Sequence, residues 1–292
     1  MLIVKLKGGL GNQLFQYAFG RALSMQANQA LVLDISHFGK TRQGETPRAF
    51  CLHHYGIAAR VGLPWWAQKA WRLRKGRMMK TFGELGLGKI REVRETSFRY
   101  EKIDAPAGRG LWSYEGYWQA PRYFEQARPF LLKELVPVRA AQGMNEEVLN
   151  QIRQSNAVSV HIRRGDYVSD AAISAFHGIC GLNYYRDAMQ GIGEQIQDPV
   201  FYVFSDDIAW AKSHIQSIHP MVFVDHNDDE TAFEDLRLMS ECRHHIIANS
   251  SFSWWAAWLN PRAEKKVIAP RRWFADTTVS CDDLIPDTWS RI

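Results

Sequence analysis

The chain has 292 residues, of which 46% are hydrophobic and 23% are charged. This length suffices for two ordinary domains or one large domain with a substantial core. The net charge is only +5, which argues against a globally cationic nucleic-acid binder. The four cysteines form no CxxC pair, so neither a zinc site nor a redox dithiol is indicated. No apolar run approaches the roughly 18 residues of a membrane span, and the amino-terminal segment is too short for a signal peptide.

The first forty residues predict a βαβ unit. An apolar strand at 2–6 is followed by a glycine-rich turn at 8–13, a helix at 14–27 and a strand at 30–34. Nucleotide-binding domains begin in this way. One alternative function is therefore a nicotinamide-dependent oxidoreductase.

A dinucleotide fingerprint would need three glycines at the helix start. Gly9 and Gly11 match, with Asp34 at about the required distance, but Leu14 stands at the third glycine position. No Gly-Lys-Ser/Thr follows, so a P-loop is not indicated either. The turn carries Asn12 and Gln13 instead, which argues against the oxidoreductase.

The segment from Arg60 to Lys80 is basic and rich in tryptophan. It contains seven Lys or Arg residues, no Asp or Glu, and Trp65, Trp66 and Trp71. This pattern allows peripheral contact with an anionic membrane or a lipid-linked acceptor, or a solvated helix packed by its tryptophans. The surrounding region, 60–110, has weak periodicity and allows no secondary-structure prediction.

An aromatic stretch, GLWSYEGYWQAPRYF, follows the unplaced region. Such rings either fill a core or line a sugar site, and the sequence does not separate these options. A second alternative function is therefore a non-catalytic carbohydrate-binding protein. A polar helix predicted at 145–154 marks the domain boundary, which gives domains at 1–150 and 151–292.

The second half alternates regularly between strands and helices. Strands are expected at 157–162, 200–204, 221–224, 244–248 and 267–269, and helices at 184–192, 208–216, 231–241 and 252–259. This β/α alternation predicts a parallel sheet. The predicted fold class is therefore α/β, with two Rossmann-type halves.

Three polar loops follow strands of the second half: HIRRGDY at 161–167, FSDD at 204–207 and NSSFSWW at 249–255. Carboxyl ends of parallel strands meet at one edge, where open α/β sheets bind their ligands. Arginines suit a diphosphate, hydroxyl and N–H groups at a helix start can bind phosphate, and a carboxylate can accept two hydrogen bonds from guanine. A nucleoside diphosphate fits all three loops.

Each loop also has a purely structural interpretation. Asp206 and Asp207 can cap the following helix, and Ser250 can do the same for the next. His161 can be an ordinary buried, hydrogen-bonded histidine. Trp254 and Trp258, four residues apart, are expected to face the core. Only the conjunction of the three loops indicates a ligand site.

Four motifs carry a resemblance to a known family. GGLGNQLFQYAFGRAL at 8–23, HIRRGDYV at 161–168, FSDD at 204–207 and NSSFSWWAAWL at 249–259 are similar to motifs of the α1,2-fucosyltransferases. The likeness runs from the first strand to near the carboxyl terminus. The resemblance implies a glycosyltransferase-B-like architecture, with an N-terminal acceptor-side domain and a C-terminal domain that binds GDP-β-L-fucose.

The resemblance also implies roles for individual residues. Arg163 is the expected diphosphate ligand and a catalytic residue, supported by Arg164. His161 and Asp207 would recognise guanosine. The remaining donor-binding residues would be Asp206, Ser250, Ser251 and Phe252. On the acceptor side, Gly11, Asn12 and Gln13 would line the cleft.

The implied reaction attaches fucose to the 2-hydroxyl of a terminal β-galactoside with inversion. Arg163 would stabilise the charge that grows on the departing GDP, so neither a metal ion nor another cofactor is expected. Asp166 or Asp170 is the best candidate for the general base. The lack of an amino-terminal anchor resembles the bacterial members, so we expect a cytoplasmic protein, with peripheral contact to the inner membrane as an option.

Overall fold

The computed structural model describes residues 1–39, 47–65, 90–108, 110–165, 176 and 178–292. The chain divides into two compact units, Met1–Glu134 and Leu135–Ile292. The division falls before the helix at 145–154, where the sequence suggested a boundary. That helix, α4, belongs to the second unit. Each unit is described by itself below.

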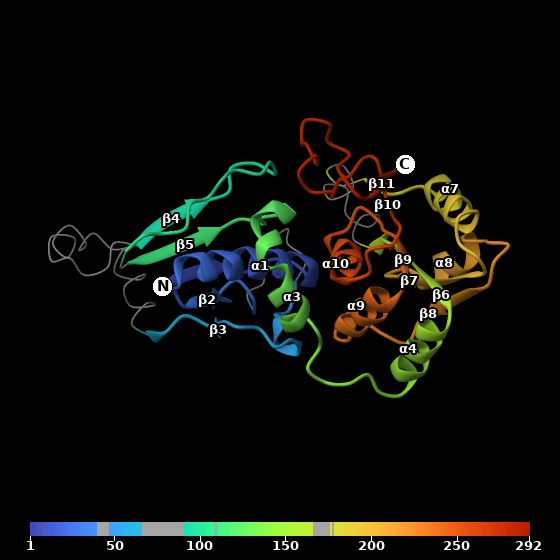
Figure 1. Ribbon diagram of the computed structural model, residues 1–292, viewed down its shortest axis with the longest axis horizontal. Coiled ribbons are helices and arrows are strands. Elements are labelled where there is room, and N and C mark those ends of the chain that lie inside the picture. Colours follow the sequence, from blue (N-terminus) through green and yellow to red (C-terminus); the bar gives the residue numbers. More distant parts are fainter. Residues whose placement is uncertain (40–46, 66–89, 109, 166–175, 177) are drawn as a thin grey trace. The chain divides into compact units, whose positions relative to one another are not determined.

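The N-terminal unit is built on a parallel five-stranded sheet (Figure 1). Its strands lie in the order β3-β2-β1-β5-β4. They are β1 (Leu2–Lys5), β2 (Leu31–Asp34), β3 (Arg60–Val61), β4 (Ile90–Arg94) and β5 (Leu111–Glu115). The helical elements are α1 (Leu10–Ala27), η1 (Leu52–His54), η3 (Pro121–Tyr123), η4 (Glu125–Ala127) and α3 (Arg128–Glu134).

Helix α1 packs closely on β1 and β2. A Cβ atom at Gly20 would lie 2.7 Å from Val4 Cγ2 and 2.9 Å from Leu31 Cδ1, so only glycine allows this approach. The helix begins at Leu10, whereas the sequence placed its start at residue 14. The prediction was wrong because Gly9, at the N-cap, provides no side-chain cap that would mark the start.

The C-terminal unit is a parallel six-stranded sheet in the order β11-β10-β9-β6-β7-β8. Its strands are β6 (Asn156–Ile162), β7 (Pro199–Ser205), β8 (Met221–Val224), β9 (His244–Ile246), β10 (Val267–Ala269) and β11 (Ser290–Arg291). Its helices are α4 (Met144–Gln154), α7 (Leu182–Gly193), α8 (Ile208–His214), α9 (Ala232–Glu241) and α10 (Ser251–Leu259). This strand order is that of a Rossmann-type sheet.

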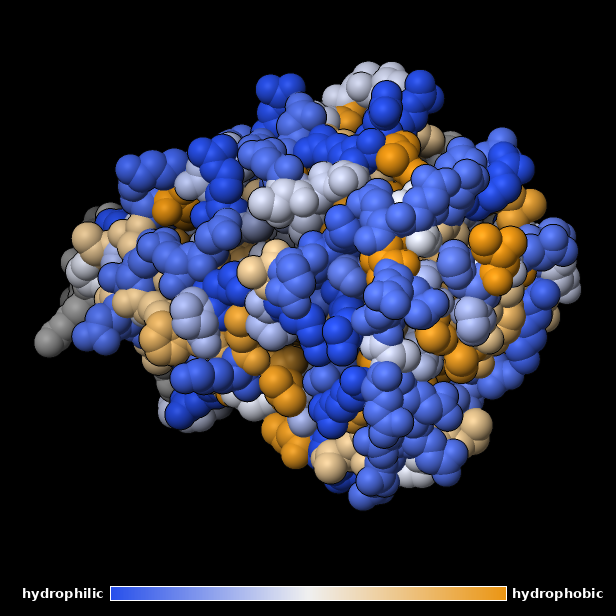
Figure 2. All heavy atoms as spheres, turned by 45° about the vertical axis from the view of Figure 1, so that its right-hand side comes forward, coloured by the Kyte–Doolittle hydropathy of each residue, from blue (hydrophilic) through white to orange (hydrophobic). Residues whose placement is uncertain are grey.

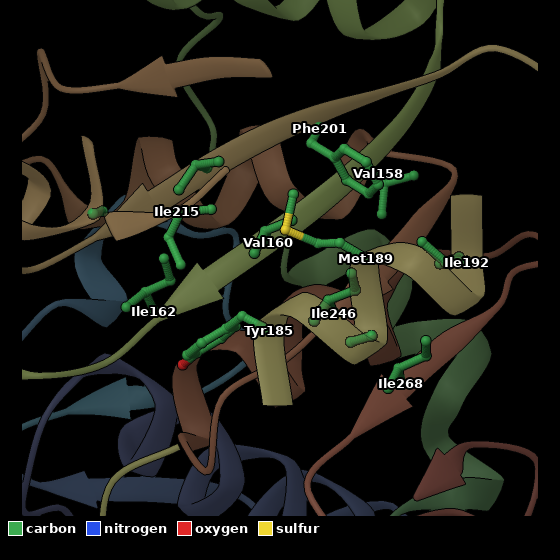
Figure 3. Close-up of a cluster of buried hydrophobic side chains, with 13 residues drawn as sticks. Val158, Val160, Ile162, Tyr185, Met189, Ile192, Phe201, Ile215, Ile246 and Ile268 are labelled. Atoms are coloured by element: carbon green, nitrogen blue, oxygen red, sulfur yellow. The ribbon is translucent and has the colours of Figure 1, made fainter. Parts of the chain in front are cut away.

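One face of this sheet carries an apolar core (Figure 3). Val158, Val160 and Ile162 of β6 point to this face and contact Tyr185 and Met189 of α7. The intervening residues of β6 point to the other face, because side chains alternate along a strand. On the surface, by contrast, hydrophobic side chains are scattered among hydrophilic ones, as the face drawn in Figure 2 shows.

The predicted fold class of two Rossmann-type halves with parallel sheets is confirmed. Each predicted strand of the second half is present. The prediction missed β3, β4 and β5, and the last strand, β11. Most of the basic, tryptophan-rich segment lies outside the described residues.

Candidate functional site

The predicted donor residues lie at the carboxyl edge of the C-terminal sheet. From β6 the chain continues to β7 and β8 on one side, and then to β9, β10 and β11 on the other. The pair β6 and β9 is therefore the point at which the strand order reverses, where such sheets bind their ligands. Arg163 follows β6, Asp206 follows β7, and Ser250 follows β9. The structure thus brings the three loops to one edge, as predicted.

Arg163 is held by an ion pair with Asp206. Its Nη1 lies 2.9 Å from Asp206 Oδ2, and both side chains are about one fifth exposed. Asp206 Oδ1 also accepts a hydrogen bond of 2.8 Å from the backbone N–H of Arg164. A Cβ atom at Gly165 would lie 2.6 Å from Asp206 Oδ2, so a side chain here would displace the Asp206 carboxylate. Asp206 therefore fixes the arginine loop to the end of β7.

Arg164 is oriented by Trp210 and Asp207. Its guanidinium group lies 3.8 Å from the centre of the Trp210 ring, and its Nε lies 3.5 Å from Asp207 Oδ2. Asp207 Oδ1 accepts a hydrogen bond from Trp210 N and so caps α8, which confirms the structural alternative for this carboxylate. Arg164 thus supports the loop through a planar stacking contact.

His161 is a buried histidine with an unpaired nitrogen. Its side chain is 5% exposed, and its Nδ1 has no hydrogen-bond partner among the described residues. Its ring centre lies 5.6 Å from that of Phe252. Burial, and then the charge of Arg163, lowers the pKa of His161 to about 3. A neutral imidazole with an unsatisfied nitrogen beside two arginines indicates a ligand partner at this edge.

The lowered pKa predicts that stability falls in acid. Between about pH 6.5 and pH 3 the unfolded state binds a proton at residue 161 that the folded state does not bind, so stability is complete above this window and decreases within it. From pH 7 to pH 5 the loss should be about 2 kcal/mol. Urea unfolding of His161→Gln should lack this part of the loss. The control is His214→Gln, at an exposed histidine. Equal pH dependence of wild type and His161→Gln would contradict the prediction.

The start of α10 supplies the third part of the site. The Ser250 side chain caps the helix by accepting a hydrogen bond of 3.3 Å from Phe252 N, and Ser251 is the first helical residue. Asn249, 3% exposed, donates to the carbonyl oxygens of Gly178 and Trp273 and so fixes the turn before the helix. A helix that starts at this edge of the sheet suits an anion, because the first N–H groups of a helix have no carbonyl partner within it.

A hollow of about 440 Å³ lies beside this turn. It extends past the ends of β9 and β10, and Asn249, Tyr184, Arg271 and Arg272 are among its lining residues. Tyr184 donates its hydroxyl hydrogen to the Ile247 carbonyl oxygen at 2.6 Å. The hollow is thus lined partly by cations and lies at the same edge as the arginine loop.

The three residues predicted on the acceptor side differ in how accessible they are to a ligand. Gln13 is fully buried; its Nε2 donates to the carbonyl oxygens of Gly8 and Ala49, and its Oε1 accepts from Cys51 N. Its amide therefore joins backbone segments, and its predicted role at the cleft stays a prediction. Gly11 is buried in the first turn of α1. Asn12 is half-buried and remains accessible.

Asp34, the acidic residue that a dinucleotide site would need, is buried and already hydrogen-bonded. Asp34 is 7% exposed, and its Oδ1 accepts a hydrogen bond of 2.9 Å from Ser36 N. The carboxylate thus caps the turn after β2. Both candidates for the general base, Asp166 and Asp170, lie outside the described residues.

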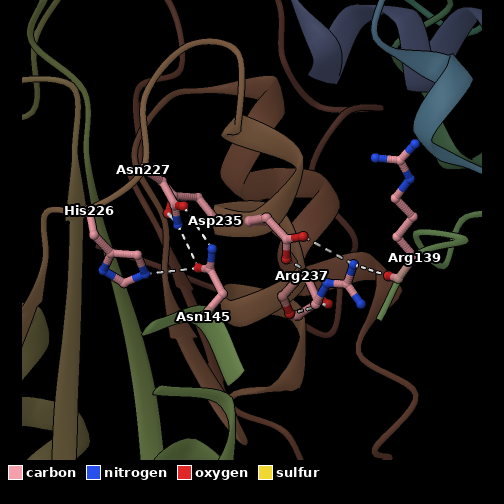
Figure 4. Close-up of polar contacts among 8 residues, drawn as sticks. Arg139, Asn145, His226, Asn227, Asp235 and Arg237 are labelled. Atoms are coloured by element: carbon pink, nitrogen blue, oxygen red, sulfur yellow. Dashed lines mark hydrogen bonds and ion pairs between the residues drawn. The ribbon is translucent and has the colours of Figure 1, made fainter. Parts of the chain in front are cut away.

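The acidic loop after β8 is bonded within the C-terminal unit. Asp225 pairs with Lys212 at 2.6 Å, and Asp228 accepts hydrogen bonds from Thr231. Asn227, in the same loop, donates a hydrogen bond of 2.7 Å to Asp235 Oδ1 of α9 (Figure 4). Its side-chain amide is also hydrogen-bonded to that of Asn145 in α4. Burial raises the pKa of Asp235 to about 6. The described residues contain no group of three His, Cys, Asp or Glu arranged for a metal ion.

Two residues that position the site were not found from the sequence. Trp210 stacks on Arg164. The only sequence feature that points to Trp210 is its position three residues after Asp207, the spacing at which an N-cap side chain accepts a backbone hydrogen bond. Asn249 was named only as part of a motif, yet it fixes the turn before α10. Trp254 and Trp258 are buried in the core with rings 6.1 Å apart, as predicted. None of the described helices is both long and apolar enough to cross a membrane.

Comparison with known proteins assigns the chain to a family. The sequence model of glycosyl transferase family 11 matches residues 91–292. The alpha-1,2-colitosyltransferase of Escherichia coli is 34% identical over 100% of this chain and 99% of its own length. The O-antigen biosynthesis glycosyltransferase WbnK of Escherichia coli is 32% identical over 97% and 98%. These matches define a glycosyltransferase. The chain belongs to glycosyl transferase family 11, which confirms the predicted resemblance.

Other matches cover less of the sequence or are more distant. The galactoside 2-alpha-L-fucosyltransferase SEC1 of Bos taurus is 32% identical over 38% of this chain and 30% of its own. The crystal structure of the fucosyltransferase NodZ from Bradyrhizobium covers 89% of this chain and 93% of its own, with 13% identity and a TM-score of 0.49. The comparisons support neither the oxidoreductase nor the non-catalytic carbohydrate-binding protein.

Proposed function

We propose that this enzyme transfers L-fucose from GDP-β-L-fucose to the 2-hydroxyl of a terminal β-galactoside, with inversion, in the assembly of an oligosaccharide or polysaccharide repeat unit. The similarity to galactoside 2-alpha-L-fucosyltransferases supports this donor and acceptor. The observation that carries the proposal is the edge of the C-terminal sheet, where two arginines, an unpaired buried histidine and a helix start converge. This combination suits a nucleoside diphosphate and its leaving charge.

In this mechanism Arg163 binds the diphosphate, and Asp206 keeps its guanidinium group in place. Arg164, stacked on Trp210, supports the loop. As the bond to the sugar breaks, negative charge grows on the departing GDP, and a fixed cation at that position stabilises the transition state. His161 stays neutral at physiological pH and offers Nδ1 to the nucleotide. The general base is Asp166 or Asp170, which accepts the proton of the galactose hydroxyl.

Colitose is a second candidate for the transferred sugar. The full-length relative with 34% identity is named a colitosyltransferase, and colitose is fucose without its 3-hydroxyl group. The donor site proposed above would contact the diphosphate and the base, which both donors share. GDP-colitose is therefore the alternative donor.

The test is a transfer assay with GDP-fucose and GDP-colitose as competing donors and β-galactosides as acceptors, read by mass spectrometry and linkage analysis. We expect fucose on the galactose 2-hydroxyl, with the anomeric configuration inverted. Preferential transfer of colitose would assign the alternative donor. Transfer of neither sugar, with activity from another nucleotide sugar, would contradict the proposal.

Activity should persist in excess EDTA. We expect this because Arg163, Arg164 and the start of α10 supply positive charge where a metal-dependent enzyme would hold its cation. The measurement is the initial rate of fucose transfer with and without EDTA. A loss of rate that manganese or magnesium restores would contradict the prediction.

A further inference from the structure

The N-terminal unit has its own switch point, between β1 and β5. From β1 the chain continues to β2 and β3 on one side, and β4 and β5 lie on the other. The residues that follow β1 and β5 therefore meet where a Rossmann-type sheet binds its ligand. A buried glutamine of α1, Gln16, joins these two segments: its Oε1 accepts from Lys7 N at 3.0 Å, and its Nε2 donates to Gly116 O at 3.1 Å.

The turn after β5 is strained. Trp118 has a φ of 57°, in the left-handed region that bulky residues rarely adopt. Its ring is 1% exposed and stacks on Phe19, with ring centres 4.0 Å apart. Such strain costs free energy, persists only where the surroundings enforce it, and gathers at ligand sites. Interactions with neighbouring residues must therefore stabilise the strained conformation of this turn.

Glu95, directly after β4, holds this turn. Its Oε2 accepts a hydrogen bond of 2.6 Å from Tyr117 N, and its Oε1 accepts one of 2.9 Å from Trp118 N. A Cβ atom at Gly116 would lie 2.5 Å from Glu95 Cβ, so the turn is in direct contact with this side chain. Burial raises the pKa of Glu95, and the two N–H donors oppose that shift. A carboxylate is thus desolvated to fix three consecutive residues.

The turn places Gln119 against Asn12, which lies in the first turn of α1. Gln119 Nε2 donates a hydrogen bond of 2.8 Å to Asn12 Oδ1. Gln119 is 9% exposed, yet neither its Oε1 nor Asn12 Nδ2 has a partner among the described residues. Whichever way the two amides are oriented, the pair leaves one donor and one acceptor open. A sugar hydroxyl is both donor and acceptor, so this pair matches it.

We propose that the amides of Asn12 and Gln119 bind the acceptor sugar, and that Glu95 is the positioning residue that holds Gln119 in place through residues 116–118. This inference rests on the proposed function and deepens it, since the ligand is a β-galactoside. Lys7 borders the same place, with its Nζ 4.4 Å from the centre of the Tyr117 ring.

The test compares Gln119→Ala, Asn12→Ala and Glu95→Gln in the full chain. Each should raise the KM for a β-galactoside roughly tenfold, the usual effect of losing a hydrogen bond to a ligand. GDP affinity and hydrolysis of the donor without acceptor should stay unchanged. In Glu95→Gln one carboxylate oxygen becomes an N–H₂ group, which cannot accept a hydrogen bond. One of the two hydrogen bonds from the backbone N–H groups of Tyr117 and Trp118 is therefore lost. The control is Glu92→Gln, the same change at an exposed position of β4.

Three outcomes separate this inference from the proposed function. If the wild type transfers fucose and only the three variants lose acceptor affinity, the subsite is assigned. If the wild type transfers fucose and folded variants keep its KM, the subsite is wrong and the proposed function stands. If the wild type transfers no sugar to any galactoside, both fail. A fall in GDP affinity equal to the loss of acceptor affinity would show a general structural effect and overturn the positioning role.

Discussion

Arg163→Lys should lower the turnover of fucose transfer by about 100-fold, which corresponds to roughly 3 kcal/mol of lost transition-state stabilisation. Lysine keeps the charge but loses the planar pair of N–H donors that a diphosphate accepts. It also cannot reproduce the geometry of the contact with Asp206 at 2.9 Å. Arg163→Ala should lose more, because the ion pair and the positive charge both disappear and Asp206 is left without this partner.

Arg164→Lys should have a smaller effect. Arg164 stacks on Trp210 at 3.8 Å, so lysine would loosen the loop without removing Arg163, the proposed diphosphate ligand. The control is Arg186→Lys, at an exposed arginine paired with its neighbour Asp187. The measurements are kcat for transfer, GDP affinity and circular dichroism of each variant. Near-normal transfer by folded Arg163→Ala would contradict the assignment of the diphosphate site.

The sequence was most informative where local pattern decides structure. In the C-terminal unit β6 and β7 are short, mainly apolar runs, and polar residues come directly after the last residue of each. The parallel order of β6 and β7 then brings Arg163 and Asp206 together. The hydrogen bond from Arg164 N to Asp206 likewise joins residues that are 42 positions apart in the sequence. The location of the three polar loops was therefore predictable, and the pairing of the Arg163 and Asp206 side chains was not.

The sequence was least informative in the middle of the chain. Strand β4, IREVR, has only two apolar residues in five positions, and they are three positions apart, so it lacks the alternation typical of a strand. Its neighbour β5 pairs with β1 across more than a hundred residues, Leu2 opposite Trp112. Such pairing gives no local signal. Glu95 illustrates the consequence, because its partner Tyr117 is 22 residues away and its role depends on both strands being placed.

The sequence also could not separate the residues predicted on the acceptor side. Gln13 and Asn12 are adjacent and equally polar, so composition does not distinguish them. Their positions on α1 do: Gln13 is fully buried against backbone segments, and Asn12 is half-buried and reaches Gln119. The helix start at Leu10 sets these directions. The sequence prediction placed the start of the helix at residue 14, which leaves Asn12 and Gln13 in a loop. In a loop, the direction of their side chains cannot be assigned.

Trp254→Ala should lower the free energy of unfolding by about 3–5 kcal/mol. Trp254 is fully buried in α10, and its ring lies within 5.5 Å of those of Trp255 and Trp289. Its Nε1 donates a hydrogen bond of 2.9 Å to the Leu284 carbonyl oxygen. Alanine would leave a large cavity and an unpaired carbonyl group. Trp254→Phe keeps most of the packing and should lose less.

The same substitution should affect the donor site, because α10 begins at the Ser250 cap beside the arginine loop. The measurements are urea unfolding at pH 7, and GDP affinity at a temperature where the variant is folded. The matched control is Trp65→Ala, because that tryptophan is 75% exposed and its removal should leave the unfolding midpoint unchanged. GDP affinity should fall for Trp254→Ala and stay at the wild-type value for the control, since only the first change removes the packing that fixes the helix start. Equal unfolding midpoints for the two variants would contradict the role of Trp254 in the core that positions α10.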